Sequence, residues 1–331
     1  MKQQKELITL KKGEPVDHYL LLKKCDLRLT KANKEYLSVE LGDKSCSLNS
    51  NIWDNFESIY NSVKPGDVVK VTGTIEEFQG TSQIKVTRIR KTSDKDGVSP
   101  IDFQARSKRS PEIMSKEFFD RIEKISTPEL KQLMKNIFNA DAFALFSIAP
   151  AGKQWHHAYI HGLIEHTLEL VRICDLMSDI HPEINRDLLV CGALMHDFGK
   201  IEELNFNSAF EYSDKGKLIG HIVISAIRIN NEAEKIPGFS EELKNCLMHL
   251  VLSHQGKLEY ASPVVPKTIE AIALYQADEL SAKVNAYINA IATEIRGDAK
   301  WTRFITLAST DLYNHEIETS KEEIINKSLF E

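Results

Sequence analysis

The sequence has none of the features that mark exported or membrane-spanning proteins. Its N-terminus has neither the apolar core nor the cleavage pattern of a secretory signal. No apolar run approaches the roughly 20 residues that cross a bilayer. The five cysteines are odd in number and scattered, without a CxxC pair. This pattern disfavours a disulfide framework and a cysteine-type zinc site, so we expect a protein of the reducing cytoplasm with no membrane partner.

Internal repeats and low-complexity tracts are also missing, and the composition is that of an ordinary globular protein. The 331 residues carry a net charge of −6, which is unevenly distributed. Residues 1–100 hold 17 Lys and Arg against 14 Asp and Glu, whereas the remainder hold 25 against 34. The first part is therefore mildly basic (17 − 14 = +3) and the rest acidic (25 − 34 = −9). This distribution favours a polyanionic partner for the first part.

Residues 1–92 show a pattern typical of β-strands. Turn sequences such as Gly42-Asp43 and Pro65-Gly66 separate segments with apolar alternation or β-branched enrichment. The predicted strands are 18–25, 35–41, 45–53, 67–78 and 82–90, with a helix over 54–63. Strands with one helix in this place follow the order of an OB-fold barrel. We expect Trp53, at the end of the third strand, to lie in the barrel core.

The rest of the chain reads as helix. The polar segment 93–110 predicts a linker, and Ser110-Pro111 is a good helix start. Helical apolar spacing covers 111–125, 128–138, 140–148, 156–178, 183–198, 218–234, 240–254 and 266–294. The sequence thus predicts a multidomain protein: an N-terminal all-β OB-fold barrel, an all-α helical bundle over 111–315, and a C-terminal tail over 316–331.

Ionisable side chains stand at inward-facing positions of five predicted helices. Taken singly, an inward His is more often a hydrogen-bonded core residue, and an inward Asp is often a cap or half of an ion pair. Isolated buried charges are costly, however, whereas a shared divalent cation would satisfy several of these side chains together. Their recurrence therefore indicates a metal site. The residues are His166, His196, Asp197, His221, His254 and Asp278.

The order of these residues resembles that of a known family. His166, His196-Asp197 and Asp278, with HDFGK closing a very apolar run, resemble the HD-domain metal-dependent phosphohydrolases. The stretches HHAYIHGLIEHTLEL, LMHDFGKIEEL and SHQGKLEYASPVVPKTIEAIALYQADELSAKV, behind an OB-fold, resemble the YhaM-type 3′→5′ exoribonucleases of bacteria. The resemblance covers nearly the whole chain. It implies a metal-dependent phosphodiesterase that degrades single-stranded RNA, or also DNA, from the 3′ end.

The resemblance also implies a metal centre with two divalent ions. The first would be held by His166, His196, Asp197 and Asp278, and the second by the bridging Asp197 with His221 and His254. Mn²⁺ is the first expectation, with Fe, Co, Ni, Zn and Mg as alternatives, because imidazoles and carboxylates suit such ions. Water activated by the ions would attack phosphorus.

Two residues are expected to be catalytic, Asp197 and Lys200. Lys200 would bind a non-bridging phosphate oxygen, and its alternative role is to stabilise a helix C-terminus. The chain departs from its relatives at Gln255, where a second adjacent His is common, and at His161, where a small residue is expected. For His156 and the adjacent His157 we expect a structural role at a helix N-terminus, with substrate contact as the alternative.

OB-fold barrels bind single strands through basic grooves and aromatic platforms. The expected nucleic-acid contacts are Arg28, Lys31, Lys34, Tyr36, Lys70, Phe78 and Lys85 in the barrel, with Arg228 in the helical domain as a second phosphate contact. Two other functions stay open: an HD-domain phosphohydrolase of small nucleotides, and a non-catalytic nucleic-acid-binding regulator. Only Gln255 favours the regulator. The sequence leaves the oligomeric state open.

Overall fold

The computed structural model describes residues 4–78, 81–153, 155–205, 210–295, 299–315, 317 and 328–330. The main boundary between two compact units lies between Arg106 and Ser107, within the segment expected as a linker. Most of the expected tail, 316–331, lies outside the described residues.

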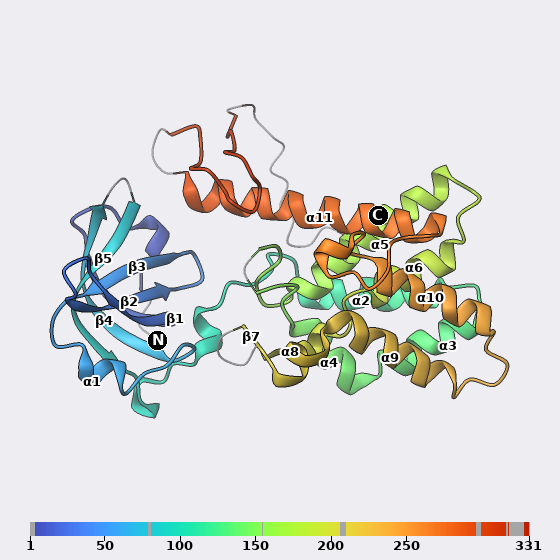
Figure 1. The fold of residues 1–331 in the computed structure, drawn as a ribbon, viewed down its shortest axis with the longest axis horizontal. Helices are drawn as coiled ribbons and strands as arrows, with labels where there is room; N and C mark the ends of the chain where they lie inside the picture. Colours follow the sequence, from blue (N-terminus) through green and yellow to red (C-terminus); the bar gives the residue numbers. More distant parts are fainter. Residues whose placement is uncertain are drawn as a thin grey trace. The chain divides into compact units, whose positions relative to one another are not determined.

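The N-terminal unit is a closed barrel (Figure 1). Its strands are β1 (Pro15–Leu29), β2 (Glu35–Gly42), β3 (Ser47–Ile52), β4 (Val68–Phe78) and β5 (Thr81–Lys91), with the helix α1 (Glu57–Tyr60) between β3 and β4. β1 pairs with both β2 and β4, and the parallel pairing of β3 with β5 closes the barrel. This is the expected OB-fold order. Helix α1 is a single turn, since Asn55 before it has a φ of +55° and Pro65 follows soon after.

Alternating strand residues fill the barrel. In β3, Leu48, Ser50 and Ile52 are buried while the residues between them are not. Because side chains along a strand alternate between two faces, the next position points outward. The expectation that Trp53 lies in the core was therefore wrong: it is 45% exposed and its ring stacks on Tyr36 with centroids 4.6 Å apart.

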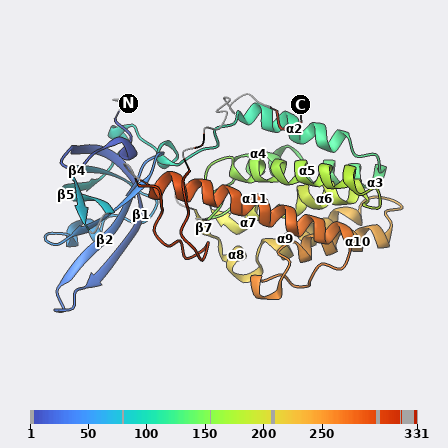
Figure 2. The ribbon, with the colours of Figure 1, turned by 90° about the horizontal axis from the view of Figure 1, so that it is seen from above.

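The second unit is helical (Figures 1 and 2). Side chains of Ser110, Asn139, Asn185, Ser240 and Thr268 cap helix N-termini by accepting a backbone N–H. The helices are α2 (Pro111–Glu123), α3 (Pro128–Ile137), α4 (Ala140–Ile148), α5 (Gly162–Ile180), α6 (Arg186–Met195), α7 (Lys200–Glu203), α8 (Asp214–Ile219), α9 (His221–Ala233), α10 (Glu241–Ser253) and α11 (Ile269–Glu294), with the short strands β6 (Leu204–Asn205) and β7 (Glu211–Tyr212).

Several expected helices begin or end elsewhere; the helix expected from 266, for example, begins at Ile269. The helix expected from 156 begins at Gly162, because His157 and His161 have φ values of +42° and +66°. The helix expected over 183–198 ends at Met195, where the chain turns before α7. Gly220, with a φ of +77°, separates α8 from α9, so the helix expected from 218 begins three residues later.

Helix α6 lies at the centre of this unit, packed against α5, α10 and α11. Gly192 permits the close approach, since a Cβ there would lie 3.2 Å from the Cβ of Leu250 on α10 and clash with its Cδ2. After α6, the fully buried Phe198 packs its ring 5.3 Å from that of Phe138. The turn that follows α6 is thereby anchored in the core. Among the described helices, none combines the length and hydrophobicity that a bilayer crossing requires.

Candidate metal centre

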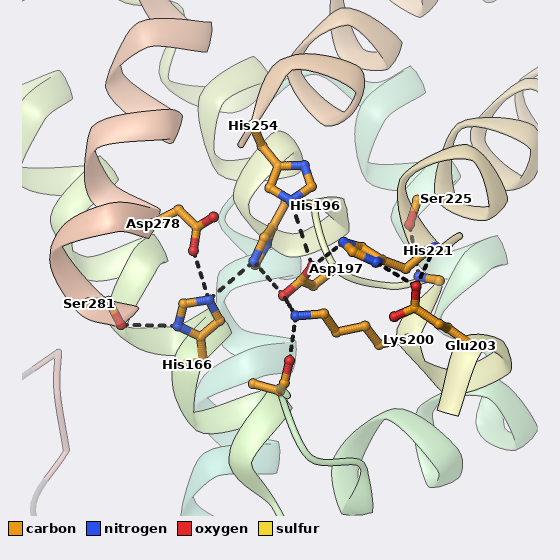
Figure 3. Close-up of polar contacts among 12 residues, drawn as sticks. His166, His196, Asp197, Lys200, Glu203, His221, Ser225, His254, Asp278 and Ser281 are labelled. Carbon is orange, nitrogen blue, oxygen red and sulfur yellow. Dashed lines mark hydrogen bonds and ion pairs between the residues drawn. The ribbon is translucent and has the colours of Figure 1, made fainter. Parts of the chain in front are cut away.

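All six residues expected as metal ligands converge (Figure 3). On one side, Nε2 of His166 on α5 lies 3.1 Å from Oδ1 of Asp278 on α11 and 3.4 Å from Nε2 of His196. Nε2 of His196 lies 3.2 Å from Oδ2 of its neighbour Asp197. Residues separated by more than a hundred positions in the sequence thus form one continuous cluster.

Asp197 extends the cluster to a second side. Its Oδ1 lies 3.2 Å from Nε2 of His221, the first residue of α9, and 3.7 Å from Nε2 of His254 after α10. Two sets of ligand atoms each lie within 4.8 Å of one another: those of His166, His196 and Asp197, and those of Asp197, His221 and His254. The two sets share one carboxylate, that of Asp197.

The outer ring nitrogens orient the imidazoles. Nδ1 of His196 lies 2.7 Å from the carbonyl oxygen of Ala193, and Nδ1 of His254 lies 2.7 Å from that of Val251. Nδ1 of His221 lies 2.9 Å from Oε1 of Glu203. Each Nδ1 faces an acceptor and therefore carries the proton, which leaves the Nε2 lone pair directed into the cluster.

The arrangement fits a bound cation better than a self-sufficient polar core. Nε2 of His166 and Nε2 of His196 lie 3.4 Å apart, so a cation between them could bind both nitrogens. Oδ1 of Asp197 and Nε2 of His221 are buried and lie 3.2 Å apart, yet neither makes a hydrogen bond to any described residue. Imidazole and carboxylate donors suit borderline divalent metals.

Lys200 lies in the same cluster. Its Nζ is 2.6 Å from Oδ2 of Asp197 and also donates a hydrogen bond to the carbonyl oxygen of Ala151. The helix does not continue to this residue, but the turn after α6 brings it to the position expected. Burial by itself would raise the pKa of Asp197, but the adjacent Lys200 ammonium and His196 hold it well below its ordinary value. The pair is therefore ionised in the protein interior.

The histidines respond to burial in different ways. Burial, reinforced by the neighbouring His196, lowers the pKa of His254 to about 4. Burial also lowers the pKa of His166, against the opposing effect of Asp278. Burial would lower the pKa of His196 as well, but the charge and hydrogen bond of Asp197, together with the charge of Asp278, raise that pKa above its ordinary value. His166 and His254 are thus neutral at neutral pH, as metal ligands must be.

Sequence reasoning missed several supporting residues. Glu203 accepts hydrogen bonds from both the backbone and the ring of His221. The hydroxyl of Ser225 accepts the N–H of Gly199 within the HDFGK turn. Ser281 contacts Nδ1 of His166 and donates a hydrogen bond to Glu169. These two could have been found from helical spacing, because Glu169 lies three residues after His166 and Ser281 three after Asp278, on the same helix faces.

The expected nucleic-acid contacts fall into separate groups. A groove of about 660 Å³ lies along the end of β3 and along β5, and Phe78 and Lys85 line it together with Trp53 and Arg88. Tyr36 adjoins the groove through its stacking on Trp53. Arg88 and Trp53 were not among the expected contacts.

The other expected contacts do not line this groove. Arg28, Lys31 and Lys34 are exposed at the end of β1 and in the loop that follows it. Lys70 lies 2.9 Å from a carboxylate oxygen of Asp17. In the helical unit, Arg228 pairs with carboxylates of α7 and α9 at 3.5 and 3.7 Å.

Comparisons with known proteins agree with both halves of this description. Residues 23–92 match the model of an OB-fold nucleic acid binding domain, and residues 163–283 match that of the HD domain. Proteins named 3′-5′ exoribonuclease YhaM are similar over most of their length. The protein of Bacillus subtilis (strain 168) is 32% identical over 82% of this chain and 86% of its own. The protein of Geobacillus sp. (strain WCH70) is 33% identical over 85% of this chain and 86% of its own.

A third relative, from Listeria monocytogenes serotype 4b (strain CLIP80459), is 32% identical over 85% of this chain and 90% of its own. The resemblance noted in the sequence, and the fold it implied, are confirmed. The alignments cover 273 to 284 residues, more than the segment 163–283 that matches the HD domain. With its barrel, its metal-ligand cluster and this extent of identity, the chain belongs to the YhaM family of 3′-5′ exoribonucleases.

Proposed function

We propose that this protein is a metal-dependent 3′→5′ exoribonuclease that hydrolyses single-stranded RNA in its helical unit and holds the strand with its barrel. One observation carries the proposal: two sets of candidate metal-ligand atoms meet at Asp197, in a chain that is 32% identical over 82% of its length to a protein named 3′-5′ exoribonuclease YhaM. DNA is a weaker substrate in this proposal, because the names of the relatives specify RNA.

The two sets of candidate ligand atoms support a proposal of two bound divalent cations, with Mn²⁺ as the first choice. His166, His196, Asp197 and Asp278 would hold one, and Asp197, His221 and His254 the other. When bound, the cations supply Lewis acidity that activates water and neutralises charge on the phosphate. Asp197 contributes an oxygen to each side, and the Nδ1 acceptors fix the imidazoles before substrate arrives.

Lys200 supplies a fixed positive charge beside the reacting phosphate. Its Nζ is held by Asp197 and Ala151, so the ammonium is kept at the cluster and not free in solvent. A charge of this kind stabilises a phosphate oxygen more strongly in a buried site than in water. We assign Lys200 to a non-bridging oxygen of the scissile phosphodiester.

The barrel groove is assigned to the single strand. Trp53 and Phe78 offer exposed aromatic faces for stacking, and Lys85 and Arg88 offer charges for phosphates. Such a surface holds RNA with little base preference and raises its concentration near the cluster. We assign Arg28, Lys31 and Lys34, which do not themselves line the groove, to secondary contacts with the RNA backbone.

A time course on RNA labelled at its 5′ end tests the proposal. We expect a descending ladder of products in Mn²⁺ and none with chelator. Asp197→Asn should abolish the ladder while binding to RNA, measured by fluorescence anisotropy, stays within about twofold, because the barrel groove is intact. Cleavage of mononucleotides in place of RNA would favour the small-nucleotide phosphohydrolase. Retained RNA cleavage by Asp197→Asn would contradict the site assignment.

A further inference from the structure

A chain of polar contacts lies behind His166, on the side away from the other ligands. Its Nδ1 lies 3.0 Å from the hydroxyl oxygen of Ser281 on α11. The same hydroxyl donates a hydrogen bond of 2.6 Å to Oε2 of Glu169, one turn along α5 from His166. The hydroxyl proton goes to the carboxylate, so the Ser281 oxygen is free to accept the Nδ1 proton of His166.

The Glu169 carboxylate is held from its other side as well. Nε2 of the fully buried His157 lies 3.3 Å from Oε2 of Glu169. The backbone N–H of His157 donates to Oδ1 of Asn285 on α11, and Nδ2 of Asn285 donates to the hydroxyl of Tyr159. The loop before α5 is thereby tied to α11, and its left-handed φ at His157 is held by these contacts.

One face of α11 organises the whole arrangement. Asp278, Ser281 and Asn285 follow at i, i+3 and i+7, so they point to the same side of the helix. Asp278 faces Nε2 of His166 and Ser281 faces Nδ1, which clamps both nitrogens of one imidazole between two residues of one helix. In the other candidate ligands, Nδ1 contacts its acceptor directly: a backbone carbonyl at His196 and His254, and the Glu203 carboxylate at His221.

We propose that Glu169 is a positioning residue that, through Ser281, fixes the tautomer and orientation of His166 and strengthens it as a metal ligand. This inference rests on the proposed function of the cluster and adds residues to it. A carboxylate placed behind a ligating imidazole raises the basicity of the nitrogen that faces the metal. Here the Ser281 hydroxyl transmits the effect of the carboxylate, because it lies between Glu169 and Nδ1 of His166 and contacts both.

The state of Glu169 agrees with this role. Burial would raise the pKa of its carboxyl, but the neighbouring His157 ring, followed by the Ser281 hydroxyl, lowers it below its ordinary value. The group is therefore a carboxylate at neutral pH.

The same atoms also resemble a metal-binding set, since ligand atoms of His157, His166 and Glu169 lie within 4.8 Å of one another. The Ser281 hydroxyl, bonded to both His166 and Glu169, occupies the space between them. The geometry favours a hydrogen-bonded relay over a further cation.

The test is the affinity of the full-length, metal-free protein for Mn²⁺, measured by isothermal titration calorimetry. Ser281→Ala and Glu169→Ala should each weaken binding by about 10- to 100-fold, the range for removal of such outer partners. Both variants break the same relay. The double variant should therefore bind Mn²⁺ with the affinity of the weaker-binding single variant, within about twofold. Glu169→Gln keeps an acceptor for the Ser281 hydroxyl, so it should bind at least about threefold more tightly than Glu169→Ala.

Ser178→Ala is the matched control, since Ser178 lies on α5 and its hydroxyl donates only to the carbonyl of Cys174. Its affinity should equal that of the wild type. Co²⁺ absorption bands should shift in Ser281→Ala but not in Ser178→Ala, which reports the ligand field directly. If Glu169→Ala fails to fold, the two serine variants decide the matter.

Several results would overturn the proposal: wild-type affinity in Ser281→Ala, losses that multiply in the double variant, or equal affinities for Glu169→Gln and Glu169→Ala. Loss of one bound ion in Glu169→Ala, with unchanged affinity for the rest, would make Glu169 a ligand and also refute it. A wild type that binds no Mn²⁺ would refute the proposed function itself, which is a different result.

Discussion

Asp197→Asn should remove the entire stabilisation that divalent cations give to this protein. Asp197 belongs to both sets of ligand atoms, whereas His254 belongs to one. A cation at about 100 times its dissociation constant stabilises the folded state by about 2.7 kcal/mol, so two cations give about 5.4 kcal/mol. For a helical unit of this size, each kcal/mol corresponds to about 2–4 °C in Tm. The wild type should therefore gain about 11–22 °C on Mn²⁺ addition.

The variants divide this gain in a defined way. His254→Gln should retain about half of it, or about 5–11 °C, because the set around His166 stays complete. Asp197→Asn should retain none. Its baseline stability with chelator should also fall by about 3–5 kcal/mol, since the buried Lys200 ammonium loses its carboxylate partner. The comparison therefore uses the Mn²⁺-induced shift of each variant, measured by differential scanning calorimetry with and without chelator.

His249→Gln is the matched control, because His249 lies on α10, the helix that His254 follows directly. Its Nε2 accepts a hydrogen bond of 2.9 Å from the backbone N–H of Lys267, outside the cluster. It should show the full wild-type shift. A persistent Mn²⁺-induced shift in Asp197→Asn would refute the shared-carboxylate assignment. A complete loss in His254→Gln would refute the independence of the two sets.

Three further outcomes test other parts of the structure. Gly199→Ala should lower the folding equilibrium constant more than tenfold, about 1.4 kcal/mol, because a Cβ there would lie 2.8 Å from the Cα of the first residue of α9. Urea unfolding measures this loss of stability, and the activity should fall with it. Trp53→Ala, in the inactive Asp197→Asn background, should weaken RNA binding by about 5- to 150-fold through lost stacking, about 1–3 kcal/mol. Trp301→Ala, which removes another exposed tryptophan paired with a tyrosine, should leave anisotropy titrations unchanged. Hydrogen bonds from the Arg90 side chain and from the Ser93 backbone hold the pKa of Asp96 well below its ordinary value. Because the pKa is lowered in the folded state, the ionised carboxylate stabilises the fold above about pH 4, and this stabilisation is lost as the pH falls further. In Arg90→Met, the free energy of unfolding should therefore depend less on pH in that range. Equal acid slopes for the wild type and Arg90→Met would contradict this.

Much of the local structure was predictable because local rules specify it. Period-2 alternation marked the strands, and Ser110-Pro111 marked where α2 begins. The six expected ligands were recognisable because each places an ionisable group at an inward-facing position of its helix. Their convergence in Figure 3 needs only that these faces pack together. The helix expected before Gly162 failed because two histidines take left-handed backbone conformations, which residue type alone does not favour.

Sequence alone determined the element order, the OB-fold followed by helices, and the identity of the inward His and Asp residues, since periodicity and caps depend on neighbours in the chain. Tertiary structure decided which atom of each imidazole faces the cluster, that Lys200 pairs with Asp197, and that Ser281 stands behind His166. Those contacts depend on how helices distant in sequence are rotated and spaced against one another. A one-dimensional pattern fixes the face of a helix, but the distance between two faces is set only when the core is packed.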